Sequence, residues 1–336
     1  MPINIDGSKG IRQNTTEVTK IPVGTTAQRP ANPEAGMIRF NTDQGFVEWY
    51  DDVGDRWLAT SSFPGVAATG GTVTDITEDG VVFRVHTFTS DGTFDVTRGG
   101  EVEYLVVAAG GSSTVRPTNG VAHGGGGAGG YRTNVPGSVS GGLSDPEPVL
   151  KIASGTYPIT VGQGVARDSG EDSVFHTITS QGGGGRDDRD GGSGGGAQGG
   201  NSRDDFGDGV AGQGFRGGTG ASDQVAGSGG GGGGGAGAQG ASLGTTNSGG
   251  AGGAGISSNI TGSPVFRAGG GGGGGGDSGG SGGIGGGGNG TSNTSPQGGV
   301  PNTGGGGGSG WGNSDGVTTA APAGGSGIVI VRYRIG

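Results

Sequence analysis

The chain has 336 residues, of which 95 are glycine, and its formal net charge is −10. Glycine therefore makes up about 28% of the chain, where ordinary proteins carry about 7%. The 14 prolines follow no Gly-X-Y period, which excludes a collagen triple helix. Cysteine is absent, which excludes disulfides and thiolate metal sites. With only 19 Lys and Arg, the composition also argues against nucleic-acid binding and does not favour an ordinary enzyme.

The first residues, 1–24, are polar and lack any hydrophobic periodicity, so we interpret them as an attachment arm, with Ile3 and Ile5 as its apolar anchors. They contain neither the basic segment nor the apolar run of a secretory signal peptide. No stretch of the chain approaches the roughly 20 apolar residues of a membrane span. We therefore expect no membrane insertion.

Residues 25–60 predict a small three-stranded β-meander. Short aromatic and β-branched runs alternate with turns at 41–45 and 51–55. A unit of this size buries little apolar surface, so we expect it to pair with copies of itself or with a neighbouring subunit. The side chains expected at that contact are Trp49, Tyr50 and Trp57.

The rest of the chain predicts one β-rich domain over 80–336, joined to the meander by a linker at 61–79. Alternating apolar positions predict strands, and no amphipathic helix pattern of useful length occurs. The predicted strands are 81–88, 93–96, 102–109, 157–161, 173–179 and 327–335. Because strands lie on both sides of a glycine-rich stretch, the ends of the domain should pair. The fold class is therefore all-β, a sandwich-like domain with a large glycine-rich insertion.

That insertion covers 181–310 and holds 60 of the 95 glycines, with uninterrupted runs at 229–235, 269–276, 285–288 and 304–308. One interpretation is a flexible linker, because Gly-rich segments behave as random coils. The other is a bundle of extended helices of the polyglycine II type, with three residues per turn, which bond to one another through their backbones. The strand at 327–335 and the Phe and Arg residues scattered through the insertion favour the bundle.

Charged loops within the insertion are the candidate contact sites. Acidic and basic residues cluster at 186–190 and 203–208. Their carboxylates suit either a Ca²⁺ ion or a sugar-binding rim, and the alternative is solvated loops with Arg/Asp pairs. An exposed Trp311 would stack on a sugar, or else cap the glycine body. The candidate receptor contacts are Asp187, Arg189, Asp204, Asp205, Phe206 and Trp311.

The sequence shows no arrangement typical of catalysis. His86, His123 and His176 are too scattered for a triad or a metal site, and His86 and His176 fall within predicted strands. No Walker, HExxH or nucleophile-elbow motif is present. A polysaccharide depolymerase would need a pair of carboxylates that the sequence does not place together. We expect no enzymatic activity and no cofactor.

Several segments together resemble proteins of tailed bacteriophages. GTTAQRP at 24–30 with GMIRFNT at 36–42 is similar to a short module of phage structural and fibre proteins. A series of motifs resembles the phage glycine-rich fibre domain. In chain order these motifs are VEYLVVAAGG at 102–111, GGGGAGGY at 124–131, YPITVG at 157–162, DSVF at 172–175, PNTGGG at 301–306 and GGSGIVIVRY at 324–333. The resemblance covers about 24–59 and 85–333.

The resemblance implies a virion protein, usually a homotrimer, of the tail fibre or host-attachment type. Its N-terminal region would join other virion proteins, and segments between glycine runs would contact a host glycan or outer-membrane protein. The alternative is a purely structural virion part, such as a head fibre, decoration protein or tail connector.

Overall fold

The protein consists of two compact units, Met1–Pro64 and Gly65–Gly336, each described here by itself. The computed structural model describes residues 21–52, 55–59, 65–113, 122–185, 190–200, 204–222, 228–244, 247–292, 294–311 and 322–335. The 3₁₀ helices that lie wholly within these ranges are short turns, η1 (Thr26–Gln28) and η3 (Gly141–Leu143). The all-β prediction is confirmed, and no described helix has the length and apolarity to cross a bilayer.

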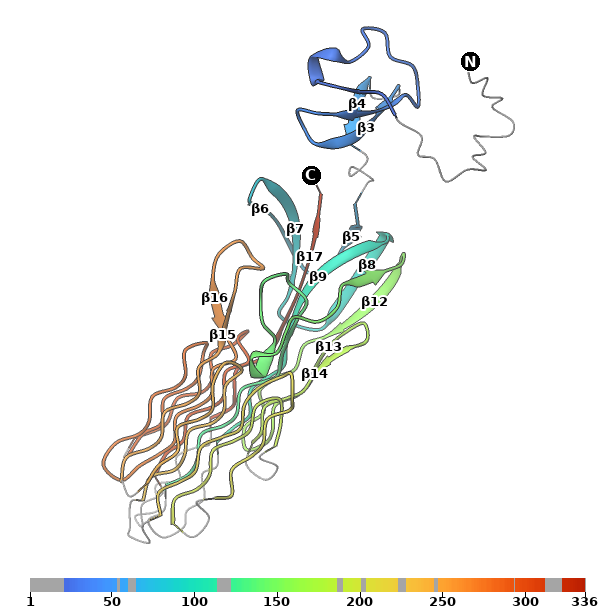
Figure 1. Cartoon of the computed structure of the whole chain (residues 1–336). Helices are drawn as coiled ribbons and strands as arrows, with labels where there is room; N and C mark the ends of the chain where they lie inside the picture. The colour runs from blue at the N-terminus through green and yellow to red at the C-terminus, as the bar shows by residue number, and fades with distance from the viewer. Residues whose placement is uncertain are drawn as a thin grey trace, which may run out of the picture. The chain divides into compact units, whose positions relative to one another are not determined.

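The N-terminal unit is a four-stranded sheet (Figure 1). Three antiparallel strands form the predicted meander, and a short fourth strand pairs in parallel with its first member. In sheet order the strands are β1 (Val23–Gly24), β2 (Ile38–Asn41), β3 (Phe46–Asp51) and β4 (Arg56–Ala59). The pairing of β1 with β2 was not predicted, because a strand of two residues is too short to show hydrophobic periodicity.

One face of this sheet buries charge instead of apolar side chains. The carboxylate of Glu48 is fully buried and accepts hydrogen bonds from Arg29 Nε at 3.1 Å and Nη2 at 2.6 Å. It also accepts one from Asn41 Nδ2 at 3.0 Å and lies 3.4 Å from Arg39 Nε. Both guanidinium groups lie about 6 Å from the ring centre of Trp57. Hydrogen bonding to Arg29 is the main cause that lowers the pKa of Glu48.

The predicted contact residues of this unit divide between its two faces. Tyr50 and Trp57 are directly opposite each other on β3 and β4, and their ring centres are 5.6 Å apart on the charged face. Trp49 lies opposite Ile38 and Leu58, on the other face. Ile3 and Ile5 lie outside the described residues.

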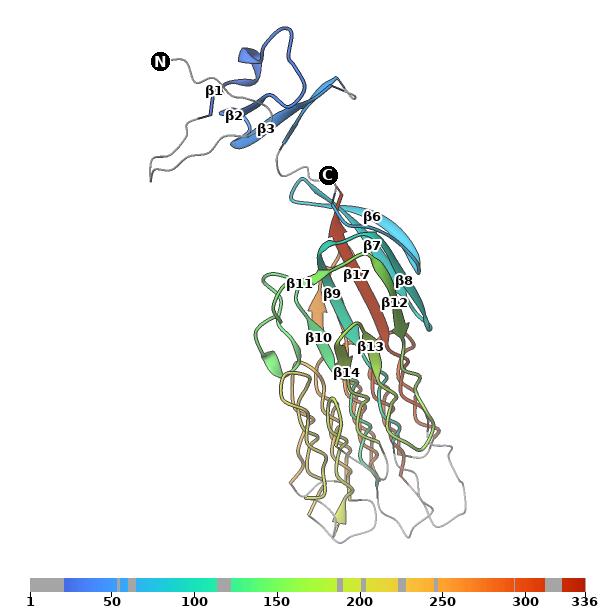
Figure 2. The same cartoon turned by 90° about the vertical axis from the view of Figure 1, so that its right-hand side faces the viewer.

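The larger unit begins with two sheets packed face to face (Figures 1 and 2). One has six strands, β10-β9-β17-β7-β6 with β11 beside β9, and the other has the order β14-β13-β12-β8-β5. The bounds are β5 (Ala67–Thr69), β6 (Thr72–Glu78), β7 (Val81–Phe88), β8 (Gly92–Arg98), β9 (Gly100–Val107), β10 (Tyr131–Thr133), β11 (Leu150–Ile152), β12 (Gly155–Thr160), β13 (Ser173–Phe175), β14 (Ile178–Ser180) and β17 (Ile328–Arg334). A hairpin of β15 (Ile256–Ser258) and β16 (Val265–Arg267) stands apart.

The C-terminal strand β17 lies between β7 and β9, so the predicted pairing of the two ends of the domain is confirmed. Its residues alternate between two cores. Val329, Val331 and Tyr333 join Phe94 and Phe175 between the sheets, while Ile328 and Ile330 join the second core, on the side of the glycine body.

His86 and His176 have different environments in this unit. His86 is fully buried on β7, with Nδ1 2.8 Å from the Gly70 carbonyl and Nε2 3.1 Å from the Tyr333 hydroxyl. Burial is the main cause that lowers its pKa. His176 is not within a strand as predicted: its φ of +56° makes the turn between β13 and β14. The stretch 173–179 is therefore a hairpin, not one strand.

The predicted linker also differs from the structure. Residues 67–69 and 72–78 of that range form β5 and β6, each at the edge of a sheet. The prediction missed β6 because the strand is exposed along most of its length, and so shows no alternation of apolar and polar residues.

Extended glycine-rich segments continue from the sheets as a set of side-by-side chains (Figure 2). The run at 229–236 shows how they bond. Every third N–H donates to the same neighbouring segment, at 2.8–3.1 Å. The pairs are Gly230 to Gly274, Gly233 to Gly271 and Ala236 to Ala268, then Gly231 to Ala197 and Gly234 to Gly194, and then Gly232 to Ala241 and Gly235 to Ala238.

Three more segments, around 125–128, 215–218 and 250–253, donate to carbonyls of the same run. The run is thus surrounded by six neighbours, with the period of three expected of polyglycine II helices. The predicted bundle is confirmed, and it extends beyond 181–310 to include 108–113, 122–130 and 322–327.

Glycine is required here because neighbouring backbones leave no room for a Cβ. A Cβ on Gly232 would overlap the carbonyl of Ala251, and one on Gly233 would overlap that of Gly126. Alanine occurs where a side chain has space, as at the fully buried Ala197 and Ala236.

We expect Gly233→Ala to lower the free energy of unfolding by about 1–3 kcal/mol or more, the usual cost of overpacking. The new methyl group would push against a backbone carbonyl that already accepts the N–H of Gly271. The matched control is Gly244→Ala, where a Cβ meets nothing within 4 Å. Chemical denaturation of both variants measures the difference, and equal stabilities would contradict the lattice.

We expect the N-terminal unit to lose stability in acid through Glu48. Its pKa is lowered in the folded state, while an unfolded glutamate titrates near about 4.3. Its contribution is therefore complete above that value and is lost as the pH falls through the lower folded pKa. Glu48→Gln should be less stable at neutral pH and should show a shallower acid transition. The near-UV circular dichroism of the Tyr50–Trp57 pair reports it, and parallel pH profiles would contradict the assignment.

Candidate functional site

The predicted receptor contacts are not brought together in one site. Asp187 and Arg189 lie outside the described residues. Asp204 and Asp205 are exposed, and Phe206 and Trp311 are half-buried. The segment with Phe206 bonds to 190–200, which bonds to 122–130, which bonds to the segment of Trp311. Two intervening segments therefore separate Phe206 from Trp311.

Phe206 is covered on one face of its ring by a cation. The guanidinium of Arg216 lies 4.7 Å from the ring centre, and its Nε donates to Gln239 Oε1 at 3.2 Å. The pair holds together two neighbouring segments of the glycine body, since Gly217 donates to Gly207. With Asp204 and Asp205 beside it, this surface offers an aromatic edge, a cation and carboxylates.

Trp311 ends the last long glycine segment. Its backbone forms an antiparallel bridge with Ala122, and its indole Nε1 is buried without a hydrogen-bond partner among the described residues. Both features fit a residue that closes the end of a segment better than one that offers its ring to solvent.

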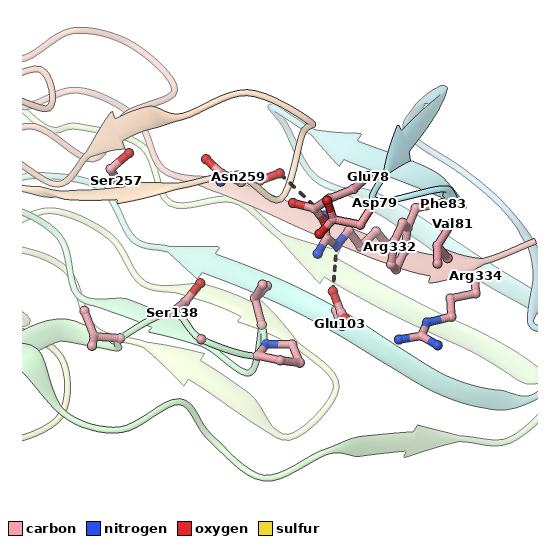
Figure 3. Close-up of a pocket in the computed structure, with 14 residues that line it drawn as sticks. Glu78, Asp79, Val81, Phe83, Glu103, Ser138, Ser257, Asn259, Arg332 and Arg334 are labelled. Carbon is pink, nitrogen blue, oxygen red and sulfur yellow. Dashed lines mark hydrogen bonds and ion pairs between the residues drawn. The ribbon is translucent and has the colours of Figure 1, made fainter.

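A cleft of about 570 Å³ lies elsewhere, on the face of the six-stranded sheet that carries the second core (Figure 3). Its walls come from the β6–β7 turn, from β9 and β17, from the loop after β10, and from the β15–β16 hairpin. No residue of the cleft was predicted as a site, because its walls are far apart in the sequence.

The centre of the cleft is the buried guanidinium of Arg332, which is 3% exposed. Its Nε donates to Glu103 at 2.6 Å, and Nη1 lies 2.8 Å from Glu78. Nη1 also lies 3.4 Å from the carbonyl of Asn259, and the group stacks 4.3 Å from the centre of Phe83. This cation contacts two carboxylates, a backbone carbonyl and an aromatic ring, so it joins β6, β9 and the β15–β16 hairpin.

What remains for a ligand in the cleft is polar and mixed in charge. Asp79 and Arg334 are exposed at its rim, and Ser138 and Ser257 line its sides. Such groups can exchange hydrogen bonds with hydroxyls of a polar ligand. No group of three His, Asp or Glu able to hold a metal ion occurs among the residues that the structure describes.

The comparisons with known proteins place the fold in a family. The model of the glycine-rich domain family matches residues 87–334, which is most of the chain. The chain belongs to the glycine-rich domain family. No curated protein and no solved structure gives a significant match.

The glycine-rich domain contains a second buried arginine with a very different environment. Arg267 is 6% exposed, yet it has no carboxylate partner in the described ranges and its Nη1 lacks any hydrogen bond. The hydroxyl of Tyr131 nearby is also buried without a partner. Burial lowers the pKa of Arg267 and raises that of Tyr131 to about 12. Among the described residues, Arg267 is therefore a buried charge without a counter-charge, and Arg332 is one with two.

We expect the two arginines to respond oppositely to removal of charge. Arg332→Met leaves Glu78 and Glu103 without their cation, and we expect a loss near the lower end of about 3–5 kcal/mol, because both carboxylates are partly exposed. Arg267→Met leaves no charge unpaired and should be neutral, or stabilising by about 1–4 kcal/mol. Chemical denaturation of the two variants measures both changes in the free energy of unfolding. Equal destabilisation would mean that Arg267 has a counter-charge.

Proposed function

We propose that this protein is a virion protein of a tailed bacteriophage, acting as a tail fibre or receptor-binding adhesin that attaches to the host cell surface. The observation that carries the proposal is the hydrogen-bonded glycine lattice. Its segments are held together by backbone hydrogen bonds along their length, with few large apolar side chains between them, and that suits a protein exposed outside the cell.

The lattice extends the chain away from the sheets. The segment 122–130 alone would span roughly 28 Å at about 3.1 Å per residue. Polar residues on its outer segments, such as Asp204 and Asp205, are then held in fixed positions. Fixed positions lower the entropy that a binding surface loses on contact.

We infer that recognition uses weak polar contacts with a host glycan or outer-membrane protein, multiplied by copy number. Several identical chains on one virion raise the effective concentration of each contact surface. A homotrimer joined through its N-terminal region to other virion proteins would provide this arrangement. The protein is expected to be part of the virion, which is assembled in the host cytoplasm.

A purely structural virion part is the second candidate, and two observations favour it. The ring of Phe206 is already covered by Arg216, and the cation of the cleft is already paired within the protein. Both interactions stabilise the protein itself. Location on the virion separates the candidates, since a head fibre or decoration protein would label the capsid and not the tail.

We expect the assembled full-length protein to bind host cells, with competition by host envelope glycans. Asp205→Lys should weaken binding by about tenfold or more if this surface contacts the receptor. The control is Asp145→Lys, which reverses an exposed carboxylate outside that surface. Flow cytometry with labelled protein measures binding. No binding by a correctly assembled sample would rule out the adhesin.

A further inference from the structure

We propose that the apolar face of the N-terminal sheet packs against the same faces of other copies of this chain. The proposal concerns residues 21–59 and does not depend on whether the protein binds a host.

The strand register gathers apolar side chains on this face. Val23 lies opposite Phe40, and Ile38 lies opposite Trp49, which in turn lies opposite Leu58. Directly opposed residues of a sheet point to the same side. Val23 is 67% exposed and Ile38 is 50% exposed, and the other three are half-buried.

The opposite face of the N-terminal sheet does not form an apolar core that could stabilise the unit. That face buries Glu48, Arg39 and Asn41, and Tyr50 is the only buried hydrophobic residue in the described part of the unit. Both hydrophobic clusters found among the described residues consist of residues from 66 onward. The N-terminal sheet therefore buries Glu48 and Arg39 on one face and leaves Val23 and Ile38 exposed on the other.

A unit of about 40 residues with this arrangement needs another source of stability. Units this small usually depend on disulfides, on a metal or on association. The chain has no cysteine, and its described residues include no group that could hold a metal. Association through the apolar face is the remaining source of stability.

The face itself indicates a second copy as its partner. It carries no unbalanced charge, because Asp51 and Arg56 form a 3.6 Å ion pair at one end. Two such faces can therefore meet without repulsion, at the spacing of about 10 Å of packed sheets. Residues 1–20 are a poorer occupant, because Ile3, Ile5, Ile11 and Val18 are their only β-branched aliphatic residues and most of the others are polar.

The test compares one substitution at two sites of similar exposure in the full chain. Ile38→Glu puts a charge on the proposed contact, and Ile284→Glu puts the same charge on a residue of the glycine-rich domain that is 56% exposed. We expect the wild-type chain and Ile284→Glu to associate in analytical ultracentrifugation. Ile38→Glu should need an about tenfold or higher concentration, as for a central contact residue. Near-UV circular dichroism of Tyr50 and Trp57 checks that the unit remains folded.

A second experiment uses the absence of cysteine and does not perturb the fold. Ile38→Cys should be cross-linked between chains by a short bismaleimide, whereas Ile284→Cys should not. A wild-type chain that stays monomeric at all concentrations would overturn the proposal. So would association that Ile38→Glu leaves unchanged, or a monomer in which a thiol at 38 is protected from alkylation, since the chain's own residues would then cover the face.

Discussion

The structure depends on backbone hydrogen bonding between segments that lack side chains. An extended three-residue helix makes no internal hydrogen bonds, so each buried N–H and C=O must find a partner on a neighbouring chain. The run around Gly232 meets this demand with six neighbours at once. Glycine loses more conformational entropy on folding than any other residue. Only a lattice in which almost every peptide group is paired can offset that loss.

The sheets set the positions of the lattice segments. The chain leaves β9 after Val107 and enters the lattice directly, and it returns from the lattice into β10 at Tyr131. Small side chains of the body, such as Ala128 and Ala268, then pack with Ile330 of the central strand in the second core. The sandwich therefore provides the apolar core that the lattice lacks, and it fixes where the first lattice segments begin.

The sequence predicted the parts of the fold that have a local signal. The three meander strands, the strand at 81–88 and the return of β structure near 328 follow from alternation and turn residues, and the structure has all of them. The strand at 327–335 and the scattered Phe and Arg residues also favoured the glycine lattice over a flexible linker. The edge strand β6 could not be predicted, because it is mostly exposed and its sequence does not alternate between apolar and polar residues.

The candidate site could be predicted far less well. The charged cleft depends on the register that brings Arg332 beside Glu103 and Glu78, more than 200 residues away, and composition holds no trace of that register. The two faces of the N-terminal sheet were also mixed in the prediction. Trp49 and Tyr50 are adjacent in sequence, and adjacency in a strand places two side chains on opposite sides.

The position of β17 has consequences for how the domain forms. This strand is the last in the chain, yet it fills the centre of the larger sheet between β7 and β9. Neither core can close before it arrives, because Val331 belongs to one and Ile330 to the other. The loop that must be closed contains the whole glycine body, and long-range pairings of this kind slow folding. A preformed lattice would shorten that search by holding the chain just before Ile328 next to β9, as the bond from the Gly110 N–H to the Gly325 carbonyl does in the folded protein. In the folded protein the glycine body thus holds the chain beside the end of β9 at the point where β17 begins.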